Sequence, residues 1–372
     1  MSNWKLLGEL IDECCIKCGN SDVEVSGVDI NKQFISTRAN LDGTDISKYY
    51  VVPKRCFACN LMHIGRDERL PIAYNDADDN IVVTSAYYVF KIKDDKRNEI
   101  LDDFLYIILS SKELDRLTWF YTDSSIRGNL KASRFKDIRI PVPSIEVQRS
   151  MVAAWQGLRD MQTQNERLAA TLMPLCRSYL QDLKHKYEAV EIGEFIEQCD
   201  ERNSDGRYGE DSVRGIATSK ELIATKANLD GVSLTSYKLV KPGEFAYVPD
   251  TSRRGDKISL GRNEEAKTIL VSSISCVFRI TDHNQLAPEY LSMLFRRAEF
   301  DRYARFNSWG SAREAFSYAD MARVRIPLPP IEVQRAIVEV FQAAQHAKRI
   351  AARAADLSKG ICPALIQRAI HS

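Results

Sequence analysis

The sequence of 372 residues predicts an α+β fold in which one β-rich domain followed by a long helix occurs twice. Three observations predict it: a repeated ten-residue segment, a strand-and-turn pattern early in each copy, and a later helical pattern with a period of 3.5 residues. We expect the two helices to run antiparallel as a coiled-coil-like pair. They would join and space two globular domains related by an internal twofold pseudo-repeat.

The repeat is clearest where each globular domain ends. Residues 140–149 return as residues 326–335, with eight of ten positions identical at an offset of 186. Far upstream, residues 37–43 match residues 225–231 at an offset of 188. The nearly constant offset indicates that the whole first half recurs as the second half. The predicted parts are two globular domains, 1–142 and 189–328, and two helical regions, 143–188 and 329–372.

Short apolar and β-branched runs in both globular domains are separated by turn-forming pairs, such as Asp-Gly at 42–43 and 230–231. This alternation is typical of strands joined by turns. One helical stretch is expected in each copy, at about 101–117 and about 287–304. The Ile-Pro-x-Pro segments that follow cannot lie inside a helix, so they predict an extended exit from each globular domain.

Apolar residues recur with heptad spacing in the first helical region. The predicted seam of that helix consists of Leu158, Met161, Asn165, Leu168 and Leu172. The corresponding seam of the second helix is built of small residues, Ala344, Ala347, Ala351 and Ala354. Large side chains opposite small ones are what two closely approaching helices use. Pro174 and Pro363 are expected to break or kink the two helices.

The composition excludes some classes of protein. Lys and Arg number 52 against 51 for Asp and Glu, so no global basic excess indicates a nucleic-acid partner, and any basic surface must be local. No run approaches the roughly 18 apolar residues of a membrane span. The N-terminus carries acidic residues before any apolar run, which argues against a signal peptide. Nine cysteines without secretory features predict reduced thiols and a cytoplasmic location.

Two β-rich domains, each followed by the junction Ile-Pro-x-Pro-x-Ile-Glu-x-Gln-Arg and a long helix, closely resemble the DNA specificity subunit of type I restriction-modification systems. The resemblance covers essentially the whole chain. It implies that each globular domain is a target recognition domain reading one half of a bipartite double-stranded DNA site. It also implies that the helices set the spacer and dock two modification (methyltransferase) subunits, which restriction subunits join. The chain itself would then be non-catalytic and hold no cofactor, with S-adenosylmethionine, ATP and Mg expected on the partner subunits.

The residues themselves support part of this interpretation. The two globular domains differ outside their shared frame, which predicts two different half-sites and an asymmetric site. A helix from about residue 145 to 173 would be about 43 Å long, and half-sites one DNA turn apart lie about 34 Å apart.

Local clusters of basic residues interleaved with Ser, Thr and Asn suit phosphate and base-edge contacts. The candidate DNA-binding residues of the first domain are His63, Arg66, Arg69, Ser125, Arg127, Lys131 and Arg134. Those of the second domain are Arg253, Arg254, Lys257, Arg262, Ser311 and Arg313. Because the repeat retains Arg127 as Arg313, these two are more expected to hold phosphate or the fold than to choose a base.

Other interpretations stay open. Cys15, Cys18, Cys56 and Cys59 form a four-thiol pattern that could hold zinc, although the second copy lacks the latter two. Asp250, Glu265 and Lys267 mimic a PD-(D/E)xK nuclease signature. The chain could also serve a type IIB-like enzyme, in which one partner carries both methylation and cleavage. A pure protein scaffold is the remaining alternative.

Overall fold

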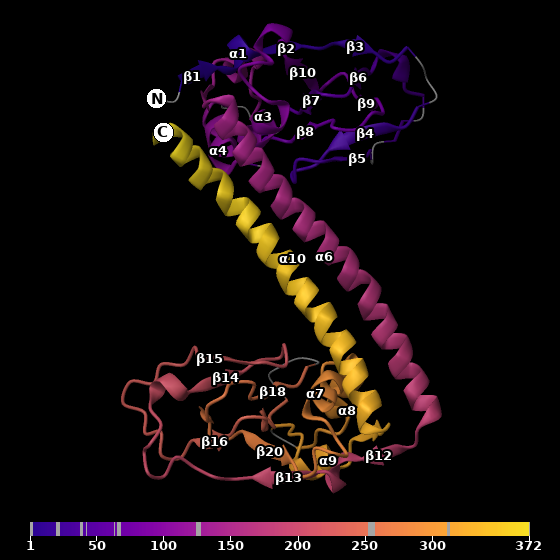
Figure 1. Cartoon of the computed structure of the whole chain (residues 1–372), viewed down its shortest axis with the longest axis vertical. Coiled ribbons are helices and arrows are strands. Elements are labelled where there is room, and N and C mark those ends of the chain that lie inside the picture. Colours follow the sequence, from indigo (N-terminus) through magenta and orange to yellow (C-terminus); the bar gives the residue numbers. More distant parts are fainter. Residues whose placement is uncertain are drawn as a thin grey trace. The chain divides into compact units, whose positions relative to one another are not determined.

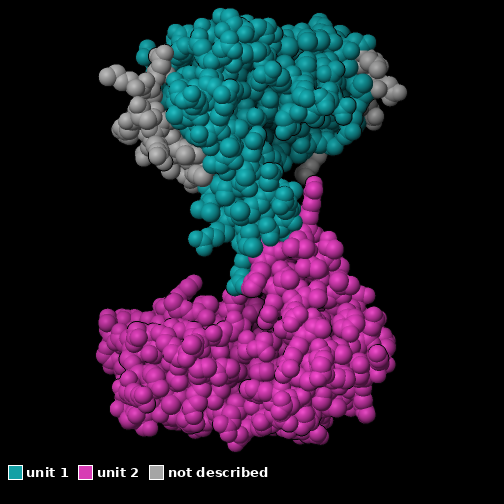
Figure 2. All heavy atoms as spheres, in the orientation of Figure 1, with its two compact units in different colours: residues 1–165, 349–372 teal, residues 166–348 magenta. Residues whose placement is uncertain are grey.

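The computed structural model describes residues 3–19, 23–37, 40–41, 43–62, 64, 68–123, 128–251, 257–310 and 313–371, the last thirteen by their backbone alone. The chain forms two compact units (Figure 2). Unit 1 contains residues 1–165 and 349–372, and unit 2 contains residues 166–348. The predicted α+β class is confirmed, and its strands and helices fall into the two repeats.

Unit 1 is organised around two sheets and one strand pair. The first sheet has the order β2-β10-β7-β8, with bounds Ile11–Glu13, Tyr88–Ile92, Cys56–Cys59 and Ile72–Tyr74. The second has the order β3-β6-β9-β4-β5, with bounds Ile16–Lys17, Tyr50–Val52, Ile81–Val83, Val25–Val28 and Phe34–Ser36. The strand pair joins β1 (Asn3–Leu6) to β11 (Arg139–Val142), so the exit from the globular part pairs with its entry.

Unit 2 repeats this plan. Its four-stranded sheet has the order β13-β20-β17-β18, with bounds Ile196–Cys199, Cys276–Ile280, Phe245–Tyr247 and Leu260–Arg262. The remaining strands pair as β14 (Arg214–Ile216) with β15 (Leu222–Ala224), β16 (Lys238–Val240) with β19 (Ile269–Val271), and β12 (Ala189–Glu191) with β21 (Arg325–Pro327). The register also repeats: Phe57 lies opposite Tyr74 and Phe90, and Phe245 lies opposite Arg262 and Phe278.

In each unit short helices pack against one face of the four-stranded sheet, within a single hydrophobic cluster. In unit 1 these are α1 (Leu7–Leu10), α3 (Asp102–Leu109), α4 (Lys112–Phe120) and α5 (Ala132–Lys136). In unit 2 they are α7 (Pro288–Phe295), α8 (Ala298–Phe306) and α9 (Tyr318–Ala322). Stacked phenylalanines fill both cores, with ring centroids 5.1 Å apart for Phe57 and Phe90 and for Phe245 and Phe278. Burying such rings removes large apolar areas from water and dominates the stability of each core.

Two long helices follow the globular parts, α6 (Ile145–Lys186) and α10 (Ile331–His371). Neither helix is broken at its proline, since α6 runs past Pro174 and α10 runs past Pro363. A proline removes one backbone hydrogen bond and costs about 3 kcal/mol inside a helix. Pro174 lies on the exposed side of α6, where water can solvate the freed carbonyl. None of the described helices combines the length and the apolar character that crossing a bilayer requires.

The helix seam differs in part from its prediction. Ala344, Ala347, Ala351 and Ala354 are buried, while Leu158, Asn165 and Leu172 are half-buried. Met161 and Leu168 are each 47% exposed, so their placement in the seam is wrong. The smaller Ala169 and Cys176 are buried instead. In unit 2 the last part of α6 lies beside the first part of α10, with Gln345 Nε2 4.0 Å from Met173 Sδ (Figure 1). Helices that approach closely leave room for small side chains between them and turn bulky ones outward.

Candidate nucleic-acid interface

In each unit two loops that the sequence singled out lie against each other. In unit 1 the Leu130 amide donates a hydrogen bond to the Leu61 carbonyl at 2.8 Å, joining the loop before β8 to the loop after α4. In unit 2 the Phe316 amide makes the same bond to the Pro249 carbonyl at 2.9 Å. We name the described parts of these surfaces loop pair 1 (residues 61–62, 64, 68–70, 121–123 and 128–131) and loop pair 2 (residues 249–251, 257–258, 307–310 and 313–317). Four segments far apart in the sequence thus form two equivalent surfaces.

Of the predicted DNA-binding residues, seven lie outside the described part of the chain: His63, Arg66, Ser125, Arg127, Arg253, Arg254 and Ser311. The described ones are mostly exposed on or beside the loop pairs. Arg69, Lys131 and Arg134 are exposed in unit 1, and Lys257 and Arg313 are exposed in unit 2. Arg69 and Lys257 occupy equivalent positions at the offset of 188. The shared basic position suits phosphate, which looks alike at every base pair.

Arg262 does not belong with the exposed basic residues. Its side chain is 14% exposed, and its guanidinium contacts Glu289 at 2.5 Å and Glu264 at 3.4 Å. Two carboxylates therefore already bind both terminal nitrogens of the guanidinium. The prediction of Arg262 as a DNA-binding residue finds no support in this geometry.

Each loop pair rests on a buried ion pair that sequence reasoning missed. In unit 1, Lys32 Nζ contacts Asp115 and donates to the carbonyl of Leu70 at 2.5 Å. The Leu70 amide in turn donates to Asp115 Oδ1 at 2.9 Å. Both polar groups of the Leu70 backbone are thereby satisfied by charged side chains. Leu70 closes the first loop of loop pair 1, so this contact fixes where that loop ends.

Unit 2 contains the same arrangement. Lys220 Nζ contacts Asp301 and donates to the Ile258 carbonyl at 2.6 Å, while the Ile258 amide donates to Asp301 Oδ1 at 3.1 Å. Lys32 and Lys220 both hold a left-handed backbone, with φ of 67° and 68°. For a non-glycine residue this conformation costs on the order of 1–3 kcal/mol. Burial lowers the pKa of both lysine ammonium groups, although the facing carboxylate opposes that shift.

Two buried amide side chains also recur. Gln148 accepts from the Leu101 amide and donates to the carbonyls of Glu99 and Pro143 at 2.8–2.9 Å. Gln334 makes the three equivalent bonds, to Ala287, Gln285 and Pro329, at 2.8–2.9 Å. Each glutamine is fully buried and ties the start of its long helix to the segment before α3 or α7.

The sequence did carry a signal for these anchoring residues. Lys32 and Lys220 differ by 188 positions, and Asp115 and Asp301 by 186. Both offsets are those of the repeat, so a residue-by-residue alignment of the two halves would have marked them. Gln148 and Gln334 lie inside the repeated junction itself.

The four cysteines considered for zinc do not form a metal site. Cys56 and Cys59 stand at the two ends of β7 and pack into different hydrophobic clusters, on opposite faces of that strand. Alternation along a strand separates side chains three positions apart in this way. Burial raises the pKa of the Cys56 thiol to about 12. In the part of the chain that the structure describes, no three His, Cys, Asp or Glu residues are grouped as metal ligands.

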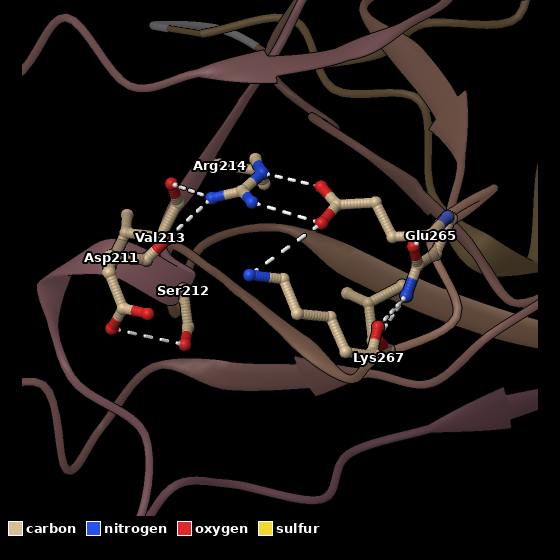
Figure 3. A network of polar contacts seen from close by, with 8 residues as sticks. Asp211, Ser212, Val213, Arg214, Glu265 and Lys267 are labelled. Atoms are coloured by element: carbon tan, nitrogen blue, oxygen red, sulfur yellow. Dashed lines mark hydrogen bonds and ion pairs between the residues drawn. The ribbon is translucent and has the colours of Figure 1, made fainter.

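The residues considered for a nuclease are used in another way (Figure 3). The Glu265 carboxylate accepts hydrogen bonds from Arg214 Nε at 2.7 Å and from Arg214 Nη2 at 3.0 Å. Lys267 Nζ lies 3.9 Å from the same carboxylate. Arg214 also donates to the carbonyls of Asp211 and Val213 (Figure 3). The hydrogen bond from Arg214 lowers the pKa of Glu265. A carboxylate bound on both oxygens by arginine is poorly placed to hold Mg²⁺.

One family model and several solved structures are similar to this chain. Residues 67–169 match the family model described as the type I restriction modification DNA specificity domain. The type I restriction-modification S subunit from M. genitalium has a similar structure, with 12% sequence identity, a TM-score of 0.62, and 99% of this chain and 96% of that chain covered. A search of curated proteins found no match.

Two further structures match over almost the same length with lower TM-scores. The HsdS subunit from Thermoanaerobacter tengcongensis gives a TM-score of 0.41 at 15% identity, covering 98% of this chain and 96% of that chain. A chain from the type I R-M system, solved in work on its complex assembly and conformational transition, gives 0.39 at 16% identity, covering 99% and 97%. The resemblance predicted from the repeated junction is confirmed: residues 67–169 match the type I restriction-modification specificity domain, and the chain has the fold of a type I S subunit.

Proposed function

We propose that this chain is the DNA sequence-recognition subunit of a type I restriction-modification complex, in which each unit reads one half of an asymmetric bipartite site. The observation that carries the proposal is the repeated loop pair. Both surfaces are held by the same buried Lys–Asp contact, yet they present different side chains. A constant frame with variable exposed residues is what reading two different half-sites requires.

The equivalent positions divide into two kinds. Arg69 and Lys257 are basic in both units and suit phosphate contacts, which position a protein on DNA without reading sequence. Other positions differ between the units: Lys131 corresponds to Ser317, Arg134 to Asp320, and Asp123 to Trp309. Trp309 is 65% exposed, which leaves its ring free to contact a base. We assign base reading to positions of this second kind.

The long helices suit the spacer and docking roles. Leu168, Leu175 and Tyr179 are 47%, 55% and 42% exposed and fall on one face of α6 by their spacing. An exposed apolar stripe on a helix marks a surface that another protein covers. We propose that a methyltransferase subunit docks there. S-adenosylmethionine, ATP and Mg would then be bound by the methyltransferase and restriction subunits, in the cytoplasm where the host DNA lies.

The test is to express the chain with its methyltransferase subunit and sequence the methylated bases of the host genome. We expect a new bipartite motif with two unlike halves. Exchanging residues 1–142 for those of another specificity subunit should change one half and leave the other unchanged. An assembled complex that modifies no new motif would contradict the proposal. A pure scaffold would additionally show no sequence-selective DNA binding.

Docking has its own test. Replacing Leu168 and Leu175 together by serine should lower the affinity for the methyltransferase subunit at least tenfold, while Arg177→Ser on another side of α6 serves as the matched control. If a single partner polypeptide both methylates and cleaves, the chain serves a type IIB-like enzyme instead. The nuclease alternative predicts that Asp250→Ala abolishes cleavage by the complex, and we expect cleavage to be unchanged.

A further inference from the structure

Unit 1 contains a cavity of about 480 Å³ between α6 and the layer formed by β8 and α3. Four aromatic residues from different elements are among those that line it: Phe34, Tyr74, Tyr106 and Trp155. Three carboxylates face it, from Asp76, Asp103 and Asp160. An aromatic and acidic lining favours a cation, because ring faces and carboxylates both attract positive charge.

The repeat shows what the equivalent place holds in unit 2. Tyr74 lies opposite Phe57 in the sheet, and its counterpart opposite Phe245 is Arg262. The guanidinium of Arg262 lies between Glu289, at 2.5 Å, and Glu264, at 3.4 Å. Glu289 corresponds to Asp103 at the offset of 186, and Glu264 corresponds to Asp76 at the offset of 188. Both units therefore carry the two carboxylates, but unit 1 has a tyrosine where unit 2 has the arginine between them.

Two cations, Lys32 and Arg159, also line the cavity of unit 1. Lys32 is neutralised by Asp115 and donates to the Leu70 carbonyl. The Arg159 guanidinium lies over the Trp155 ring, 4.7 Å from its centroid. For the carboxylates of Asp76 and Asp103, the described part of the chain provides no ion pair. The cavity of unit 1 therefore holds three carboxylates against the single charge of Arg159, whereas in unit 2 Arg262 lies between the two equivalent carboxylates.

The negative charge of the cavity disfavours ionisation of its carboxylates, and a bound cation would remove that penalty. Burial, together with the nearby carboxylates of Asp102 and Asp76, raises the pKa of Asp103. The first turn of α3 favours acidic residues through the helix dipole, which can account for Asp103 alone. It does not account for Asp76, which follows β8 and faces the same cavity.

We propose that this cavity receives an arginine side chain from a protein docked beside α6, with its guanidinium between Asp76 and Asp103. The arrangement would reproduce in trans the contact that Arg262 makes within unit 2. The carboxylates of unit 1 are on aspartates, one methylene shorter than the glutamates of unit 2, which leaves room for a side chain entering from outside. The acidic lining repels DNA phosphates. The identity of the donor rests on the proposed function, which makes it the methyltransferase subunit.

The first experiment uses the chain alone and a minimal probe. N-ethylguanidinium should give a saturable change in tryptophan fluorescence through Trp155, and the neutral isostere N-ethylurea should not. The response should disappear in Asp76→Asn/Asp103→Asn and in Tyr74→Arg, where the chain supplies its own arginine as unit 2 does. Asp95→Asn, which removes an exposed carboxylate outside the cavity, is the matched control. Equal responses to both probes, or no response to either, would overturn the proposal.

The second experiment measures the affinity of the same variants for the methyltransferase subunit. We expect at least a tenfold loss for Tyr74→Arg and for the double aspartate variant, with Asp95→Asn unchanged. If Tyr74→Arg fails to fold, the double variant carries the test. Unchanged affinity in a complex that still methylates a bipartite motif would overturn the arginine contact and leave the proposed function intact. Selective N-ethylguanidinium binding without any new methylated motif would contradict the proposed function. The cavity would then still be a guanidinium site, but the methyltransferase subunit would not be its partner.

Discussion

The two units are alike in their buried polar contacts and unlike on their surfaces. The buried ion pair of Lys32 and Asp115 in unit 1 recurs in unit 2 as Lys220 and Asp301. The buried Gln148 of unit 1 recurs as Gln334, with the same hydrogen bonds. By contrast, Asp123 of loop pair 1 corresponds to Trp309 of loop pair 2. The repeat preserves the residues that hold the loops. These residues are paired in the protein interior, where loss of one partner lowers the free energy of unfolding.

The largest effect should come from breaking one buried ion pair. Lys32→Met leaves the Asp115 carboxylate buried without its counterion and should lower the free energy of unfolding of unit 1 by about 3–5 kcal/mol. Lys220→Met should do the same in unit 2. Hydrogen exchange would locate each effect, because the amides of Leu70 and Ile258 lose protection separately. Lys48→Met, which removes an exposed ion pair with Asp45, is the control. Unequal decreases in the free energy of unfolding for the two lysine variants would show that the two ion pairs do not stabilise their units equally.

The buried glutamines come next. Gln148→Ala leaves the Leu101 amide and two carbonyls without partners and should cost about 3 kcal/mol, and Gln334→Ala should cost a similar amount. Urea denaturation of the two variants measures both. Gln156→Ala, an exposed glutamine on α6, should change stability by less than about 0.5 kcal/mol. A neutral Gln148→Ala would mean that water replaces the side chain and that the junction is not an anchor.

Surface changes should separate the units by function rather than stability. Within the proposed function, Arg313→Ala should weaken DNA binding of the assembled complex by about 1–3 kcal/mol if it reads a base, or lower the salt slope by about 1 if it holds phosphate. Binding isotherms at several salt concentrations distinguish the two. The exposed Arg302 on α8 provides the control, Arg302→Ala. An Arg313→Ala complex that behaves as wild type in both measurements would move the DNA surface away from loop pair 2.

The smallest effect should have opposite signs in the two units. The pKa of Asp103 lies above its ordinary value of 3.8, so its charge destabilises unit 1 at neutral pH and the penalty vanishes as pH falls below that value. Asp103→Asn should therefore stabilise the chain by less than about 1 kcal/mol at neutral pH and have no effect in acid. Glu289→Gln should destabilise it by about 1 kcal/mol, because Arg262 loses its charged partner. Thermal unfolding across pH measures both, and two effects of the same sign would contradict the comparison.

Much of the fold could be predicted because the sequence contains two copies of the same pattern. The repeated junction at 140–149 and 326–335 indicates where both long helices begin, and heptad spacing indicates the first of them. The face of α6 could be predicted only in part. Met161 and Leu168 satisfy the heptad pattern as well as Leu158 and Leu172 do, yet each is 47% exposed while Leu158 and Leu172 are half-buried. Pattern alone does not give the distance between two helices.

The candidate site divides in the same way. Basic residues in short segments indicated the loops, and the structure brings those loops together through contacts such as Leu130 to Leu61. Arg262 was misjudged because its partner Glu289 lies 27 positions away, on a different element. Lys32 and Lys220 were overlooked because a lone lysine in a sequence suggests solvent, and only packing shows that it is buried.

The two units also differ in how they are assembled from the chain. Unit 2 is continuous, from residue 166 to 348, whereas unit 1 joins residues 1–165 to the segment that begins at 349. During synthesis from the N-terminus, unit 2 has all its residues before unit 1 does. Until the segment that begins at residue 349 has been synthesised, unit 1 lacks one of its two chain segments. The interval of translation between residues 165 and 349 is therefore when nascent unit 1 is incomplete and most exposed to misfolding.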